Sequence, residues 1–249
     1  MFDPSITPVI FAHRGACASA PENTLASFEL AVKQLADAVE LDAKLSKDGQ
    51  VVVIHDPTVD RTTNGSGSVN RLTLAELKTL DAGGKFDPKY KGEKIPTLDE
   101  VFESVGGKVF VNVELTNYKS SRDALIEKTA RIVKNHKMEA RVIFSSFLPK
   151  NLIAIRKLLP DTLVGLLCLE GAAGLLSRSF FFRKVFPLAI HPYLADVSGP
   201  YVANEHKNKR RVHVWTVNEE NDLKRLAEIG VDGIFTDDPM KARRILGRE

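Results

Sequence analysis

Short apolar runs alternate along the chain with stretches whose apolar residues recur at helical spacing. The runs rich in β-branched residues predict strands near 9–12, 38–42, 109–114, 141–145, 162–167, 187–191, 211–216 and 232–236. The amphipathic stretches predict helices near 22–36, 97–105, 121–137, 149–159, 199–208, 219–229 and 238–247. Alternation of strands and helices is typical of parallel strands, and eight such units predict a closed α/β barrel of the TIM (β/α)8 type.

A ninth apolar run, at 51–54, does not fit the barrel. Only residues 46–49 separate it from the second strand, which is too short for a parallel crossover. The Asp48-Gly49 pair favours a hairpin turn. We therefore expect 39–45 and 50–55 to form an antiparallel hairpin at the rim of the barrel. With residue 45 opposite residue 50, Glu40 lies beside His55.

A long polar stretch, about 57–96, follows the hairpin, and only Thr73 to Leu80 in it has a helical pattern. A stretch of this length inside a compact fold is usually an insertion or a functional lid. We expect one barrel domain over residues 1–249, with this stretch as an insertion.

Ionisable residues stand where several apolar runs end, and the C-terminal ends of barrel strands are where functional residues gather. His13 and Arg14 follow the first run, and His55 follows the ninth. Glu40 and Asp42 stand at i and i+2, so both face one side of the second strand. If Val39, Leu41 and Ala43 face the helices, these carboxylates face the barrel lumen.

Glu114, at the end of the third strand, is a third carboxylate at a matching position. Three carboxylates around an open site suit a hard cation such as Mg²⁺, Ca²⁺ or Mn²⁺, whereas any one of them alone would more often form a salt bridge. Two histidines with these carboxylates and an arginine are the components of a metal-assisted phosphoryl-transfer site. His13 and His55 would act as general acid and base, and Arg14 would bind a phosphate oxygen.

Other strand-end residues leave alternatives open. Trp215 can form a wall of the pocket or belong to the core, and His191 can form a pocket wall or make a capping hydrogen bond. Cys17 is expected near the site without a catalytic role. The Lys207–Arg211 cluster is interpreted as a solvated loop or helix end.

The composition and charge of the chain narrow the class of protein and the kind of partner that it can have. The chain has 249 residues, a formal net charge of +3, 43% hydrophobic and 27% charged residues, as in an ordinary soluble enzyme. The weak charge fits an anionic small molecule and does not predict a nucleic-acid partner. Two cysteines without metal-type spacing predict reduced thiols. The first residues lack a signal-peptide pattern, and no run is long enough to span a membrane, so a cytoplasmic protein is predicted.

The motifs together resemble the glycerophosphodiester phosphodiesterase family. They occur in order from residue 12 to residue 239. The matching stretches are His-Arg-Gly-Ala at 13–16, Pro-Glu-Asn-Thr at 21–24, Val-Glu-Leu-Asp at 39–42, Lys-Asp-Gly at 47–49, His-Asp-Pro-Thr-Val-Asp-Arg-Thr-Thr-Asn-Gly at 55–65, Ile-Pro-Thr-Leu-Asp-Glu at 95–100, Asn-Val-Glu-Leu at 112–115, Ser-Ser-Phe at 145–147, Val-Trp-Thr-Val-Asn at 214–218 and Gly-Val-Asp-Gly-Ile-Phe-Thr-Asp-Asp-Pro at 230–239.

The resemblance implies a barrel of the phospholipase-C-like phosphodiesterase type that hydrolyses glycerophosphodiesters to sn-glycerol 3-phosphate and an alcohol. It implies His13 and His55 as the acid–base pair and Arg14 as a phosphate ligand. It also implies that Glu40, Asp42 and Glu114 hold one divalent cation. The cation, the alcohol, the oligomeric state, and the choice between a cyclic intermediate and direct attack by water stay open.

Two stretches depart from the family pattern or are unusual. Many members carry a lysine two residues after the third metal carboxylate, whereas Thr116 stands there, so Lys119 could reach back or Thr116 could donate instead. Residues 175–186 interleave apolar and basic residues, which favours either packing across the barrel mouth or contact with a membrane surface. Membrane contact would favour a lysophospholipase D-like activity. A non-catalytic phosphodiester-binding barrel is the alternative from another class.

Overall fold

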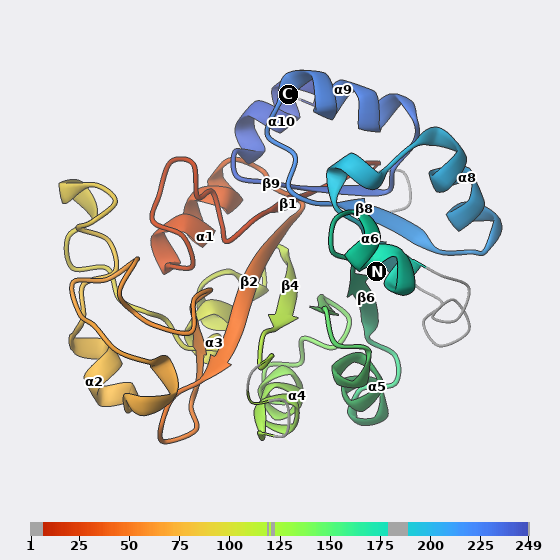
Figure 1. Cartoon of the computed structure of the whole chain (residues 1–249). Coiled ribbons are helices and arrows are strands. Elements are labelled where there is room, and N and C mark those ends of the chain that lie inside the picture. Colours follow the sequence, from red (N-terminus) through yellow and green to blue (C-terminus); the bar gives the residue numbers. More distant parts are fainter. Residues whose placement is uncertain (1–6, 119, 121–122, 179–188, 249) are drawn as a thin grey trace.

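Eight parallel strands close into a barrel, as the sequence predicts, and a ninth strand pairs outside it (Figure 1). The structure is a computed structural model that describes residues 7–118, 120, 123–178 and 189–248. The order of the strands is β1-β9-β8-β7-β6-β5-β4-β2, and β2 pairs with β1 to close the ring. Their bounds are β1 Val9–Ala12, β2 Ala38–Leu45, β3 Val51–Val53, β4 Phe110–Leu115, β5 Val142–Ser146, β6 Leu163–Leu167, β7 Ala189–His191, β8 Arg211–Val214 and β9 Gly233–Thr236.

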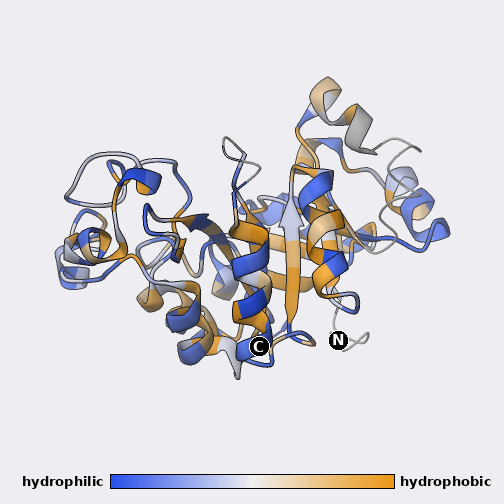
Figure 2. Cartoon of the chain, turned by 90° about the horizontal axis from the view of Figure 1, so that it is seen from below, coloured by the Kyte–Doolittle hydropathy of each residue, from blue (hydrophilic) through white to orange (hydrophobic). Residues whose placement is uncertain are grey.

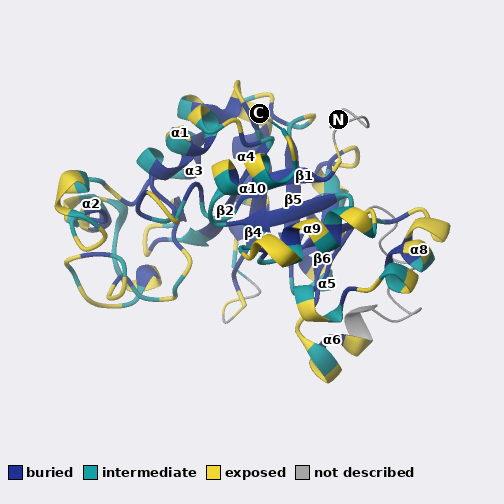
Figure 3. Ribbon diagram, turned by 90° about the horizontal axis from the view of Figure 1, so that it is seen from above, coloured by how far each residue is buried: buried dark blue, intermediate teal, exposed yellow. Residues whose placement is uncertain are grey.

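Helices cover the outside of the barrel (Figure 1). The helices of the described residues are α1 Leu25–Lys33, α2 Leu74–Thr79, α3 Leu98–Val101, α4 Leu125–Asn135, α5 Pro149–Leu158, α6 Gly171–Arg178, α8 Gly199–Lys207, α9 Glu220–Glu228 and α10 Pro239–Ile245. Of these, α2 belongs to a segment beside the barrel rather than to its outer layer. Most start at or within a few residues of the positions that the sequence predicts. Hydrophobic residues follow the strands and the helix faces that meet them, whereas exposed residues lie on the outer helix faces and in the loops (Figures 2 and 3).

Side chains alternate along β2 as predicted. Val39, Leu41 and Ala43 pack in the apolar layer between the strands and the helices. Glu40 and Asp42 face the other way, into the lumen pocket described below. The floor of the lumen is apolar and includes Phe11 and Phe235. The carboxylates at the upper end of β2 are therefore enclosed by apolar layers below and outside them.

The predicted hairpin forms, but its predicted register is wrong by one residue. Leu45 pairs with Val51 rather than with residue 50. The backbone N–H of Ser46 donates to the carbonyl oxygen of Gln50 at 2.9 Å, so the loop has three residues, 47–49, rather than four. Gly49 at φ 74° supplies the left-handed position that such a loop needs. The paired strands end at Val53, so His55 lies beyond the ladder rather than opposite Glu40.

The predicted insertion packs on the hairpin through a small core of its own. Val52 and Ile54 of the hairpin contact Val69 of a 3₁₀ turn, Leu77 of α2 and Ile95. In Figure 1 this region stands beside the barrel as the yellow and orange segment that contains α2. The insertion therefore holds the residues that follow β3 against the rim of the barrel.

One further expectation is wrong in part, and another is not tested. Within the basic cluster Lys207–Arg211, Arg210 is buried and pairs with the buried carboxylate of Glu205, so this residue is not solvated. Of the stretch 175–186, residues 175–178 form the end of α6 and the rest lies outside the described residues. In the described parts of the chain, no helix has the length and apolar character needed to cross a membrane.

Candidate active site

One pocket at the mouth of the barrel brings together seven of the eight residues that the sequence predicts for the site. Its empty volume is about 470 Å³, which suits a small molecule. The predicted residues that line it are His13, Arg14, Glu40, Asp42, His55, Glu114 and Trp215. The eighth, Lys119, lies outside the described residues.

The three carboxylates meet because of the strand register. Parallel pairing of β2 with β4 sets Asp42 opposite Glu114 and Glu40 opposite Asn112. Glu40, Asp42 and Glu114 each offer an oxygen within 4.8 Å of the others. Burial, followed by repulsion from neighbouring carboxylates, raises the pKa of both Glu40 and Glu114. A divalent cation would remove this repulsion.

The surrounding atoms also fit a cation with oxygen ligands. The Nδ2 atom of Asn112 donates to the hydroxyl of Ser145 at 2.8 Å. Its Oδ1 atom is buried and accepts no hydrogen bond from the described residues. Asn112 lines the same pocket, so its free carbonyl oxygen is a further candidate ligand. Three carboxylates and one amide oxygen form the donor set that hard divalent cations prefer.

Arg14 is held by its own backbone as well as by its side chain. It adopts φ 55°, and its backbone N–H donates to the Oε2 atom of Glu40 at 2.9 Å. Its Nη1 atom donates to Glu22 at 3.0 Å, and its Nε atom lies 3.6 Å from Asp42. Gly15 has φ 85°, and a Cβ atom there would lie 2.3 Å from the hydroxyl of Ser27. This tight turn fixes the guanidinium beside the carboxylate cluster.

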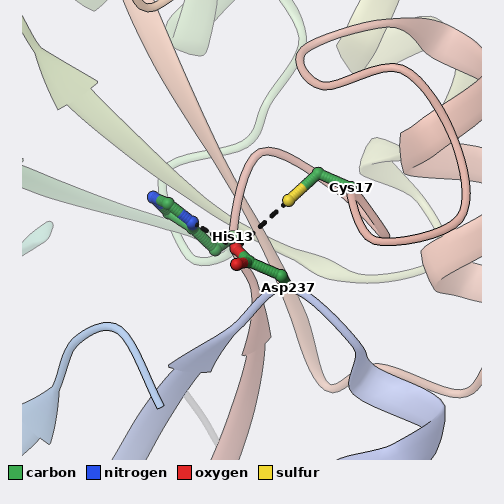
Figure 4. Close-up of side chains that lie close together, drawn as sticks. All are labelled: His13, Cys17 and Asp237. Atoms are coloured by element: carbon green, nitrogen blue, oxygen red, sulfur yellow. Dashed lines mark hydrogen bonds and ion pairs between the residues drawn. The ribbon is translucent and has the colours of Figure 1, made fainter. Parts of the chain in front are cut away.

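His13 is oriented by a carboxylate that the sequence analysis did not single out. Parallel pairing of β1 with β9 sets Ala12 opposite Thr236, so His13 and Asp237 follow side by side. The Nδ1 atom of His13 lies 2.7 Å from Asp237, and Figure 4 shows this carboxylate between the His13 ring and the Cys17 thiol. The thiol donates to it at 3.1 Å and the Asn218 amide at 2.6 Å.

The ionised state of Asp237 fixes the tautomer of His13. Burial alone would raise the pKa of Asp237, but hydrogen bonds from His13, Cys17 and Asn218 lower it to about 2. An ionised carboxylate only accepts, so Nδ1 of His13 carries the hydrogen and Nε2 remains for the substrate. The signal in the sequence was the position of Asp237 directly after the last strand, equivalent to that of His13 after the first.

His55 has a similar partner in a more exposed setting. Its Nδ1 atom lies 2.7 Å from Asp56, and its side chain is 43% exposed, against 22% for His13. Arg61 donates to Asp56 and to Glu22, and Glu22 accepts from Arg14. The hydrogen bond from Arg61 outweighs burial and lowers the pKa of Asp56. A chain of ion pairs thus connects His55 to Arg14.

Aromatic side chains, Phe147 and Trp215, form part of the pocket wall. The ring of Phe147 meets Trp215 edge to face at 5.7 Å and Tyr118 at 5.8 Å, measured between ring centroids. The Tyr118 hydroxyl donates to Glu114 at 2.6 Å. Trp215 is anchored by a hydrogen bond from its Nε1 atom to the carbonyl oxygen of His191 at 2.7 Å. Trp215 both lines the pocket and packs against the apolar floor of the lumen.

Both interpretations of the His191 side chain are wrong, because it is buried in the lumen below the pocket. Its Nε2 atom lies 3.1 Å from Nδ1 of His213. Both rings are buried beside Phe235 and Phe11, respectively. Burial lowers the pKa of His191 to about 3 and that of His213 well below its ordinary value. These histidines are neutral parts of the barrel core.

Comparison with known proteins decides the family. Residues 13–241 match the family model of the glycerophosphoryl diester phosphodiesterase family. The chain belongs to this family. Its sequence is 43% identical over 232 residues to the glycerophosphodiester phosphodiesterase of Caldanaerobacter subterraneus subsp. tengcongensis, with 93% of this chain and 94% of the relative covered. The chain is therefore a phosphoric diester hydrolase.

Two further relatives bear on the ligand. The fold matches an Oleispira antarctica phosphodiesterase solved with the product sn-glycerol-3-phosphate, at TM-score 0.88 and 32% identity, with 96% of this chain and 97% of that chain covered. A lysophospholipase D of Rattus norvegicus is 30% identical over 269 residues, with 94% of this chain and 84% of the relative covered. The relatives of this chain thus include proteins named as a phosphodiesterase and as a lysophospholipase D.

Proposed function

We propose that this enzyme hydrolyses glycerophosphodiesters to sn-glycerol 3-phosphate and an alcohol with the help of one divalent cation. The observation that carries the proposal is the paired arrangement of His13 and His55. Each imidazole is fixed through Nδ1 to an aspartate, and both line the pocket that contains the three carboxylates. Hydrolysis of a phosphodiester needs one group to take a proton and another to give one.

Each residue of the site has its own role in the proposed reaction. One histidine accepts a proton from the nucleophile, which is either water or the neighbouring glycerol hydroxyl, and the other protonates the departing alkoxide through its Nε2 atom. If the hydroxyl attacks, water then opens the cyclic phosphate with the two proton transfers reversed. Arg14 binds a non-bridging phosphate oxygen. Glu40, Asp42 and Glu114, with Asn112 as a further oxygen donor, would hold the cation. When bound, the cation supplies charge neutralisation at the phosphate oxygens. The aromatic wall around Trp215 shields the reacting groups from water.

The test removes each imidazole separately. Purified protein with Mg²⁺ is assayed on glycerophosphocholine as wild type, His13→Ala and His55→Ala. Each variant should lose about 10²- to 10⁴-fold in kcat, which is the usual contribution of an acid–base group. His206→Ala is the matched control, because His206 also pairs with an aspartate, at 2.8 Å, and is 42% exposed. Activity of either site variant within about tenfold of wild type contradicts the assignment.

The cation is tested in the same assay. Chelation should abolish turnover, and adding back Mg²⁺, Ca²⁺ or Mn²⁺ separately should show which ion restores it. Glu114→Gln should weaken the activating ion at least tenfold, because it removes one charged ligand of three. Full activity after exhaustive chelation would contradict metal dependence.

The second candidate is a lysophospholipase D-like activity, which the rat relative favours. Turnover of lysophosphatidylcholine above that of glycerophosphocholine would support it. We also propose that residues 1–249 form one domain and that the protein acts in the cytoplasm. Limited proteolysis giving two stable fragments would contradict the first of these proposals, and fractionation with membranes would contradict the second.

A further inference from the structure

Lys44 places an ammonium group beside the carboxylate cluster. It follows Asp42 by two residues on β2, so it lies on the same side of the strand. Its Nζ atom donates to the Thr116 hydroxyl at 2.6 Å. The ammonium also lies within electrostatic reach of Asp42, Glu114 and Asp56. It therefore lies near both the carboxylate cluster and the aspartate that orients His55.

Thr116 is built to hold this ammonium. Its hydroxyl donates its hydrogen to the carbonyl oxygen of Ala43 at 2.7 Å, so the oxygen faces Lys44 only as an acceptor. Thr116 is buried, which keeps water from competing for that oxygen. Within the described part of the chain, this is the hydrogen bond that the Lys44 ammonium makes. An ammonium carries three N–H groups, so two of them lie outside this hydrogen bond.

We infer that Lys44 binds the phosphate of the substrate and that Thr116 is its positioning residue. The inference rests on the proposed function, because it needs a phosphodiester in this pocket. Lys44 on β2 and Thr116, the residue directly after β4, then bring a positive charge to a strand end where the side chain at position 116 carries none. The alternative is that Lys44 only offsets the charge of the carboxylates, in which case it would oppose cation binding without contacting phosphate.

Binding measurements separate these two roles. Inorganic phosphate and glycerol 3-phosphate are titrated calorimetrically into protein saturated with Mg²⁺, as wild type and as Lys44→Met. Loss of a charge-assisted hydrogen bond should weaken both ligands about 10- to 100-fold. Lys134→Met, an exposed change at the end of α4, is the control and should leave both affinities unchanged. Tighter Mg²⁺ binding by Lys44→Met with unchanged phosphate affinity would overturn the inference.

Variants of Thr116 test whether Lys44 and position 116 serve the same phosphate. Thr116→Val keeps the shape of the side chain but removes the acceptor, so phosphate affinity should fall by about 3- to 10-fold. Lys44→Thr combined with Thr116→Lys returns the ammonium from the opposite strand and should recover at least half of the loss on a logarithmic scale. An exchanged variant as weak as Lys44→Met counts against a shared phosphate position. If Lys44→Met does not fold, Lys44→Gln takes its place.

These outcomes also separate the inference from the proposed function. A wild-type protein that binds phosphate through Lys44 but hydrolyses no glycerophosphodiester refutes the proposed function and leaves the inference standing. A wild-type protein that hydrolyses glycerophosphodiesters, with Lys44→Met equal to it in phosphate affinity, refutes the inference alone. A wild-type protein that binds neither ligand and hydrolyses no glycerophosphodiester refutes both.

Discussion

The barrel contains two pairs of histidines in opposite electrostatic settings. At the mouth, His13 and His55 each contact an aspartate that is ionised at neutral pH. In the floor, His191 and His213 contact each other among aromatic rings, and burial lowers both of their pKa values. An imidazole beside a carboxylate can take up a proton, whereas one in an apolar layer cannot. The carboxylate, rather than the histidine itself, distinguishes a candidate catalytic group from a core residue.

Among substitutions of the aspartates and of Cys17, the largest loss of kcat is expected when the carboxylate that orients His13 is removed. Asp237→Asn keeps the shape but replaces the acceptor Oδ1 with an amide that can donate, which favours the wrong tautomer of His13. We expect kcat to fall by about 10²- to 10³-fold. The pH–rate profile should also change, since the partner that stabilises imidazolium is gone. Because Asn218 and Cys17 contact the same carboxylate, a thermal melt close to wild type is needed to assign the loss to His13.

The two buried histidines in the floor of the barrel, His191 and His213 (the floor pair), should make the folded protein less stable in acid. The pKa of both histidines is lower in the folded protein than in the unfolded chain, where it is near 6.5. The unfolded chain then binds more protons, so the free energy of unfolding falls as the pH drops below 6.5 toward the folded pKa. From pH 7.5 to pH 5 the loss is about 2 kcal/mol per histidine.

Denaturant unfolding across this pH range checks the floor pair. His213→Phe replaces one titrating ring with an apolar ring beside Phe11. The variant should lose less stability than wild type between pH 7.5 and pH 5. Equal slopes for the two proteins would mean that the pair is not the source of the acid sensitivity.

Much of this comparison could be predicted from the sequence and part of it could not. His13 and His55 stand at apolar-to-polar transitions, and strand alternation sends Glu40 and Asp42 to the lumen, so local rules find them. Asp237 lies 224 residues from its partner. Only closure of β1 against β9 brings the two together, and no local pattern encodes that register. The hairpin register failed for a local reason, since loops of three and four residues are both compatible with an Asp-Gly turn.

Asp56, the exposed aspartate that orients His55, should contribute less to kcat than the aspartate that orients His13. Asp56→Asn replaces one of the two charged acceptors of Arg61 with a neutral amide, but water can reach and orient the more exposed imidazole of His55. We expect kcat to fall by about 10-fold, or about 1.4 kcal/mol. Steady-state kinetics of Asp56→Asn and Asp237→Asn, measured side by side, sharpen the comparison. A larger loss for Asp56→Asn would reverse our ranking of the two supports.

The smallest effect is expected at Cys17, which contacts Asp237 from the side opposite His13. Burial, followed by the nearby Asp237 charge, raises the pKa of this thiol, so it is a neutral donor at pH 7 and not a nucleophile. Cys17→Ser retains a donor, and its kcat should stay within about twofold of wild type. Cys17→Ala removes one of three hydrogen bonds to Asp237 and should cost about two- to fivefold. A loss above about tenfold for Cys17→Ser would mean that the thiol takes a direct part in the reaction, because the serine hydroxyl can still donate the hydrogen bond to Asp237.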